Sequence, residues 1–123
     1  MVAFSLREFL IQLDLLARMK LICIVSISHS AFERWHRGAI QRIKRNEGRF
    51  EILGDSFALY LREENIGSIL LVNDSGDEEA GPAVEIHNRS GCLLARIQSP
   101  PEPEANARWR DAMVTKSVRA VGA

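Results

Sequence analysis

The chain has 123 residues, the usual size of one domain with one hydrophobic core. Hydrophobic residues make up 46% of it and charged residues 26%, which excludes collagen-like, low-complexity and wholly disordered chains. The 16 basic residues balance the 16 acidic ones, so the whole chain has no net charge to attract nucleic acid or an anionic membrane. We therefore expect a single domain over residues 1–123.

Cysteine usage and the N-terminal sequence predict the compartment. Cys23 and Cys92 have no Cys-x-x-Cys partner and no histidine at metal-ligand spacing, so a disulfide scaffold is not expected. No basic leader precedes an apolar stretch, so no signal peptide is expected. The longest charge-free run near this end, Leu21 to Phe32, is shorter than the roughly 20 apolar residues of a membrane span. These features predict a soluble cytoplasmic protein without membrane contact.

The first two predicted elements are a helix and a strand. From Ser5 to about Met19, apolar residues recur at steps of three and four, which indicates an amphipathic helix. Ser5 is a suitable N-cap, and Glu8 three positions later completes a capping box. The short β-branched run from Leu21 to Ile27 favours a strand buried on both faces.

The next segment combines a strand with a basic stretch. A second strand is predicted from Ala31 to Arg37, with Arg34 and His36 on one face and Trp35 on the other. The stretch from Gly38 to Gly48 is rich in basic residues and poor in apolar ones, so we expect a basic loop with room for a short helical turn.

Five further strands and a second helix complete the chain. The run Ile69 to Val72 is apolar at consecutive positions, which is typical of a central strand covered on both sides. A solvated acidic loop is expected over 74–81, a type I turn over Asn88 to Gly91, and a helix from about Glu104 to Lys116. The five strands are Arg49 to Leu53, Phe57 to Arg62, Ser68 to Asn73, Ala83 to His87 and Cys92 to Gln98.

The order of these elements defines the fold class. Consecutive strands this close in sequence leave no room for crossover helices, so the sheet must be largely antiparallel. The predicted order is a helix, five to seven strands and a second helix. We therefore predict an α+β fold with a largely antiparallel sheet flanked by an N-terminal and a C-terminal helix.

Charge is unevenly distributed along the chain. Residues 33–51 hold six basic and three acidic residues, whereas residues 55–79 hold one basic and seven acidic residues. Arg34 and Arg37 beside Trp35 could hold a flat anion such as a porphyrin or a nucleotide, because guanidinium groups pair with carboxylates and aromatic faces cover a ring. The alternative is that these arginines are only solvated. Nucleic acid is not expected as a partner, because the sheet offers only Tyr60 with acidic residues nearby.

The histidines are candidate iron ligands, because imidazole ligates haem iron. His36 shares a strand face with Arg34, and His87 faces away from the core side of its strand. For both, an ordinary structural position explains the residue equally well. Tyr60 and Met113 could also ligate haem, and packing is the alternative for each. No glycine-rich phosphate loop, Gly-x-Ser-x-Gly or His-Glu-x-x-His motif is present, so the sequence shows no apparatus for hydrolase chemistry and leaves enzyme activity open.

The motifs that bear on the family are Lys20 to Val25, Gly48 to Phe50, Leu61 to Ile66 leading into Ser68 to Val72, and Val84 to Ile97. In their order and spacing they resemble the ChuX/HutX family of cytosolic haem-utilisation proteins and, more distantly, one half of the duplicated HemS/ChuS proteins. The resemblance implies a haem-iron-utilisation-like fold, a homodimer that mimics the duplicated relatives, and a role in binding or transferring haem. Some relatives are also associated with haem breakdown.

The same resemblance implies where axial histidines would lie: just before Gly48 and near the start of the following central strand. This chain has Arg45, Asn46 and Glu47 at the first place and Ser68 at the second. Three hypotheses follow. The chain sequesters or transfers haem with His36 or His87 as a substitute ligand, or it is a dimeric interaction or small-ligand-binding module without iron chemistry, or it cleaves the haem that it binds.

Overall fold

The computed structural model describes residues 2–29, 32–73 and 81–122. Within them, two α-helices accompany eight strands, all antiparallel to their neighbours, which confirms the predicted fold class. The elements are β1 (Val2–Ala3), α1 (Leu6–Arg18), β2 (Ile22–His29), β3 (Phe32–Asn46), β4 (Arg49–Gly54), β5 (Ala58–Arg62), the 3-10 turn η1 (Glu63–Asn65), β6 (Ile66–Val72), β7 (Ala83–Asn88), β8 (Leu93–Gln98) and α2 (Pro103–Gly122). The strand order in the sheet is β1-β6-β7-β8-β2-β3-β4-β5.

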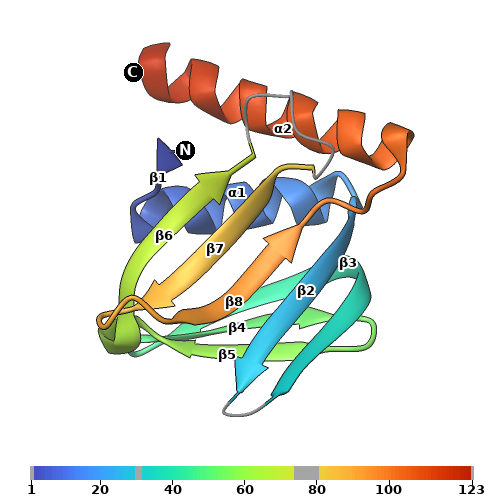
Figure 1. Ribbon diagram of the computed structural model, residues 1–123. Helices are drawn as coiled ribbons and strands as arrows, with labels where there is room; N and C mark the ends of the chain where they lie inside the picture. Colours follow the sequence, from blue (N-terminus) through green and yellow to red (C-terminus); the bar gives the residue numbers. More distant parts are fainter. Residues whose placement is uncertain (1, 30–31, 74–80, 123) are drawn as a thin grey trace.

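The sheet folds back on itself around α1. Strands β6, β7, β8 and β2 form a front layer, while β4 and β5 lie behind its lower part (Figure 1). The long strand β3 belongs to both layers, and its pairing register with β4 shifts between Ile40 and Arg42. Such a bulge bends a strand. Helix α1 packs behind the front layer, and its Phe9 ring meets the Phe50 ring of β4 with centroids 6.1 Å apart.

Helix α1 begins as the sequence predicts. The Ser5 hydroxyl accepts a hydrogen bond from the Glu8 backbone N–H at 3.1 Å, and the Glu8 carboxylate accepts one from the Ser5 N–H at 3.0 Å. This capping box satisfies two N–H groups at the start of the helix. The face of α1 toward the sheet is fully buried and consists of Phe9, Gln12, Leu13 and Leu16.

The prediction of a basic loop over 38–48 is wrong, because this segment is the second half of β3. Only one face of this part of β3 packs against the core, where Ile40 is buried and Ile43 is half-buried. The other positions from Gln41 to Asn46 carry exposed polar or charged side chains, so the segment has few apolar residues without being a loop. A tight turn at Glu47 and Gly48, both with positive φ, joins β3 to β4 and matches the twist of a two-residue hairpin.

Two strands are less enclosed than predicted. In β2, Cys23 and Val25 are buried, but Ile22 on the opposite face is 40% exposed. Strand β6 is not central, because it lies between the two-residue β1 and β7 near one edge of the sheet. Ile22 is exposed because the helices and the folded-back strands cover only the inner face of the front layer.

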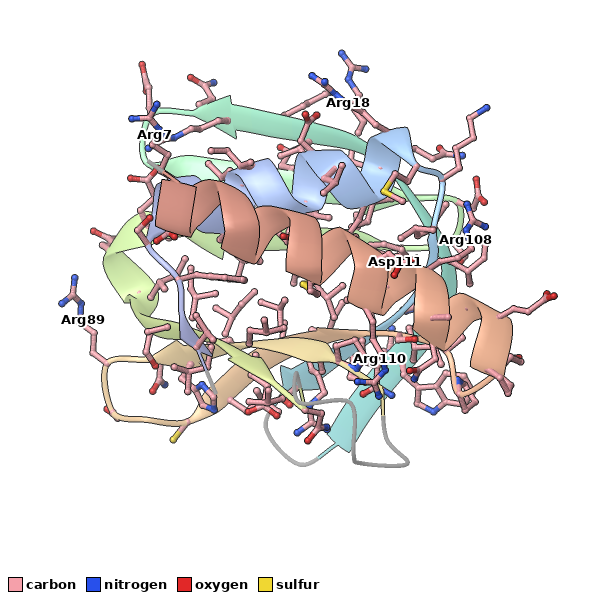
Figure 2. All side chains as sticks on the ribbon, turned by 90° about the horizontal axis from the view of Figure 1, so that it is seen from above. Arg7, Arg18, Arg89, Arg108, Arg110 and Asp111 are labelled. Carbon is pink, nitrogen blue, oxygen red and sulfur yellow. The ribbon has the colours of Figure 1, made fainter. Side chains whose placement is uncertain are left out.

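The predictions for the C-terminal part are largely confirmed. The Asn88 side chain accepts hydrogen bonds from the backbone N–H groups of Ser90 and Cys92, which closes the turn between β7 and β8. Helix α2 lies beside α1 (Figure 2) and runs beyond the predicted end, to Gly122. Its buried Trp109 donates a hydrogen bond to the Ile22 carbonyl at 3.0 Å. Except for Gly81, the predicted loop 74–81 lies outside the described residues.

Candidate ligand-binding site

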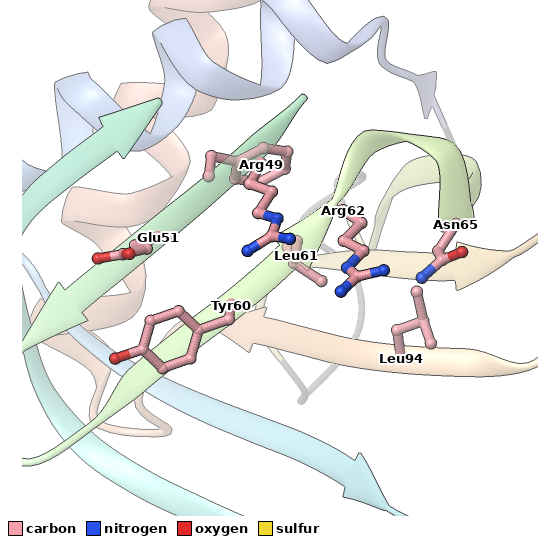
Figure 3. Close-up of a pocket in the computed structure, with 8 residues that line it drawn as sticks. Arg49, Glu51, Tyr60, Leu61, Arg62, Asn65 and Leu94 are labelled. Carbon is pink, nitrogen blue, oxygen red and sulfur yellow. The ribbon is translucent and has the colours of Figure 1, made fainter. Parts of the chain in front are cut away.

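A hollow of about 500 Å³ opens beside the free edge of β5, and we call it the β5 hollow (Figure 3). This volume lies within the roughly 300–1,000 Å³ of small-molecule sites. The hollow draws its lining from β4, β5, η1 and β8, so it exists only in the folded-back sheet. It is lined by Arg49, Phe50, Glu51, Tyr60, Leu61, Arg62, Asn65 and Leu94.

The pairing of β4 with β5 sorts the lining residues into two groups. Arg49 is paired with Arg62, and Phe50 with Leu61. Because side chains alternate along a strand, Tyr60 joins the two arginines on the outer face, whereas Phe50 and Leu61 point into the core. Tyr60 is 67% exposed, and Phe50 is 1% exposed. The hollow therefore combines a charged and aromatic outer wall with an apolar inner border.

The two arginines give the hollow its electrostatic character. They are direct cross-strand partners, and Figure 3 shows their guanidinium groups extending the same way over the hollow. Like charges directly opposite each other destabilise a strand pair. The shortest ion pair of Arg62 is a loose one to exposed Glu64 at 3.8 Å, and Arg49 has no ion pair with any residue that the structure describes. An anion between the two guanidinium groups would relieve this repulsion.

Two other charged residues near the hollow, Arg45 and Glu51, do not interact with the guanidinium groups of Arg49 and Arg62. Arg45 is not available to such an anion, because its guanidinium holds the Glu63 carboxylate at 2.8 Å. Glu51 also lines the hollow, but its carboxylate points away from the two guanidinium groups (Figure 3). A smaller hollow beyond them shares Arg49 and Arg62 and reaches Gly48 at the hairpin tip. The positive end of the β5 hollow therefore lies close to the first place where the family resemblance implies a histidine.

Of the five residues predicted to bind a cofactor, only Tyr60 lines the β5 hollow. Arg34 and His36 lie on the inner face of β3, where the His36 ring stacks on Phe57 with centroids 6.2 Å apart. Arg37 lies on the opposite face and forms an ion pair of 2.6 Å with Glu102 before α2. The hydrogen bond from Arg37 lowers the pKa of the Glu102 carboxyl group. The structure thus does not bring these arginines together around one ligand.

His87 occupies a separate polar cluster on the outer face of the front layer. Its Nε2 lies 3.5 Å from the Glu85 carboxylate, which also holds Arg96 through contacts of 2.9 and 2.6 Å. The His87 Nδ1 is buried without a hydrogen-bond partner among the described residues. His87 is also the strand partner of Ser68, the second place where the resemblance implies a histidine. In the part of the chain that is described, no three metal-binding side chains gather in one group.

Sequence reasoning missed Arg49, Arg62, Asn65 and Leu94 as site residues. A signal for the first two was present, because the predicted strands and the turn at Gly54-Asp55 set the register that pairs Arg49 with Arg62. Leu94 could not be found in this way, because it reaches the hollow from β8 only after β3 has bent.

Comparisons with known proteins agree on the fold. ChuX matches with a TM-score of 0.74 and 11% identity over 99% of this chain and 78% of its own. PhuS from Pseudomonas aeruginosa, described as a heme-binding protein, matches with a TM-score of 0.74 and 18% identity over 89% of this chain. ChuS, described as an E. coli heme oxygenase, matches with a TM-score of 0.71 and 16% identity over 93% of this chain. The chain spans 33% of PhuS and 36% of ChuS.

Three further results complete the comparison. No curated protein matches the chain. No helix in the described parts of the chain has the length and apolar character to cross a membrane. The model of the haemin-degrading HemS.ChuX domain matches residues 7–115, which include all of both helices except the first residue of α1 and the end of α2. The chain therefore belongs to the haemin-degrading HemS.ChuX domain family.

Proposed function

We propose that this protein binds haem in the β5 hollow and sequesters or transfers it in the cytoplasm. The observation that carries the proposal is the cross-strand pair of Arg49 and Arg62 above a hollow of about 500 Å³. Family membership supports the same ligand, since the matched domain is described by its action on haemin and PhuS is described as heme-binding. Release of intact haem and its breakdown are both compatible with this binding step.

The lining suits the chemical parts of haem. Arg49 and Arg62 would hold the two propionates, because guanidinium groups form charge-assisted, bidentate hydrogen bonds with carboxylates. The exposed Tyr60 ring and the Leu94 side chain would cover the flat apolar macrocycle. The Asn65 amide next to Arg62 adds a donor at the propionate end. Bound haem supplies an iron centre, whereas the chain supplies charge, an aromatic wall and shelter from water.

Titration with ferric haem tests this function. We expect a saturable Soret shift at about one haem per chain, and a Kd that rises by roughly tenfold or more in the Arg49→Gln, Arg62→Gln double variant. Arg18→Gln is the matched control, because Arg18 is an exposed arginine on α1 whose ion pair among the described residues is with Asp14, four residues earlier. Absence of a saturable shift, or equal loss in the control, would contradict the proposal.

The histidine variants His36→Ala and His87→Ala belong to the same titration. His87 has the stronger case as a substitute iron ligand, because it lies opposite Ser68, where the resemblance implies a histidine, whereas the His36 ring packs against Phe57. A changed Soret position in His87→Ala would assign the ligand to β7 and would place haem on the outer face instead of in the β5 hollow.

We also propose a homodimer formed through the outer face of the front layer. Trp35 on this face is 66% exposed, and Ile22 on the adjacent strand is 40% exposed. Large exposed aromatic side chains are typical anchors of protein interfaces. Sedimentation of the wild type is expected to show a dimer, and Trp35→Glu to shift it toward the monomer. A monomeric wild type at micromolar concentration would contradict this part of the proposal.

A further inference from the structure

We infer that the β5 hollow selects its ligand by two carboxylates and a flat apolar body, and that it binds iron-free dicarboxylate porphyrins about as tightly as haem. This inference rests on the proposed function, because it concerns the same hollow. It goes further by naming the ligand class as porphyrins with or without a metal.

The first argument is the chemistry of the lining. Its charged donors are the guanidinium groups of Arg49 and Arg62, which recognise carboxylates. The Asn65 amide adds a neutral donor beside Arg62, Glu51 lies at the far end, and the aromatic and aliphatic surface comes from Tyr60 and Leu94. The two histidines whose side chains are described, His36 and His87, lie on other strands outside the lining. Apart from the Tyr60 phenol, whose part in iron ligation the experiment below tests, none of the groups that favour binding distinguishes a porphyrin that holds iron from one that does not.

The second argument is the repulsion within the arginine pair. Arg49 and Arg62 are direct cross-strand partners, so their repulsion is relieved by any ligand that places carboxylates between them. This gain depends on the charge of the ligand and not on the metal at its centre. It should disappear when the carboxylates are esterified, although the flat macrocycle stays the same.

The third argument is the distribution of negative charge in the same hollow. Glu51, the cross-strand partner of Tyr60, lies toward the end away from Arg62, and its carboxylate points away from the guanidinium groups. A dianionic porphyrin is therefore expected to lie with its two carboxylates at the Arg49 and Arg62 end and its apolar edge toward Tyr60. This orientation follows from the carboxylates and the apolar edge of the porphyrin, and not from a metal at its centre.

The experiment compares three ligands on the full chain by equilibrium titration: haemin, protoporphyrin IX, and the dimethyl ester of protoporphyrin IX in detergent, with protoporphyrin IX repeated in that detergent. We expect Kd values for haemin and protoporphyrin IX within about threefold of each other, and binding of the ester weaker by at least about tenfold. The Arg49→Gln, Arg62→Gln double variant should weaken haemin and protoporphyrin IX by the same factor. Arg18→Gln is the control for general loss of arginine.

Each outcome decides between the two proposals. If haemin binds but protoporphyrin IX binds more than tenfold more weakly, iron ligation governs selection and the inference is overturned, while haem binding stands. If the ester binds as well as the free acid, the carboxylate argument is overturned. If neither haemin nor protoporphyrin IX binds, the proposed function itself fails. Tyr60→Phe adds a spectroscopic readout: a changed Soret band of bound haemin would show that the phenol ligates iron, which also overturns the inference.

Discussion

The two faces of the β4–β5 hairpin have the same backbone and opposite roles. On the inner face, Phe50 and Ile52 are almost completely buried against α1 and the front layer. On the outer face, Arg49 and Tyr60 project into solvent at the β5 hollow. The inner face stabilises the fold because it removes apolar surface from water. The outer face keeps two repelling guanidinium groups side by side, which is an arrangement that stability alone would not favour.

The largest expected effect tests the inner face. Phe50→Ala should lower the free energy of unfolding by about 3 to 5 kcal/mol, because it leaves a cavity where a ring 1% exposed meets Phe9. Glu51→Ala, one residue later on the other face, should change it by no more than about 0.5 kcal/mol. Chemical denaturation of both variants measures the contrast. Similar losses in the two variants would show that the faces do not differ in this way.

Cysteine chemistry gives a second contrast between inside and outside. Burial raises the pKa of the Cys23 thiol from 9.0 to about 12, whereas Cys92 lies exposed near the β7–β8 turn. Above pH 9 the unfolded chain loses the Cys23 proton and the folded chain keeps it, so stability falls as pH rises. The expected loss at pH 10.5 is about 2 kcal/mol relative to pH 7.

The measurement is the free energy of unfolding at pH 7, 9 and 10.5 for the wild type and for Cys23→Ala. The variant removes this pH dependence and leaves that of the other titrating groups, so the difference between the two curves isolates Cys23. A thiol reagent at pH 8 should label one cysteine in the folded protein and two in the unfolded protein. Rapid labelling of both in the folded protein would contradict the buried position.

One fully buried residue on α1, the helix that packs against the inner face, is polar. Gln12 on α1 is fully buried, and its amide nitrogen and oxygen have no hydrogen-bond partner among the described residues. Burying an amide without hydrogen bonds costs free energy, and methionine has a similar length but no group that needs a hydrogen bond. Gln12→Met should therefore raise the free energy of unfolding by about 1 kcal/mol. A loss of stability in thermal and chemical denaturation would show that the amide is satisfied in solution.

Local patterns predicted the inner face better than the outer one. The alternation in 57–62 correctly placed Leu59 and Leu61 inside, and the Ser5–Glu8 capping box correctly started α1. The pattern failed along the second half of β3, because a strand that packs on one side shows few apolar residues and its bulge near Gln41 has no clear sequence signal. The β5 hollow depends on that bend, which brings Leu94 of β8 toward β5, so only part of the site could be predicted.

The smallest expected effect concerns the outer face and joins its two roles. Arg49→Glu would place a carboxylate directly opposite Arg62 and replace repulsion with attraction, so it should raise the free energy of unfolding by about 0.2 to 1 kcal/mol. Arg42→Glu is the control. Arg42 lies on β3 directly opposite Leu53 of β4, so a glutamate there gains no oppositely charged cross-strand partner. The same Arg49→Glu variant should lose saturable haem binding, since its carboxylate would repel the propionates. A residue whose replacement stabilises the fold and abolishes binding is retained for its ligand. If Arg49→Glu instead destabilised the chain and bound haem normally, the arginine pair would stabilise the fold and would not be needed for ligand binding. The inner and outer faces of the hairpin would then not have opposite roles.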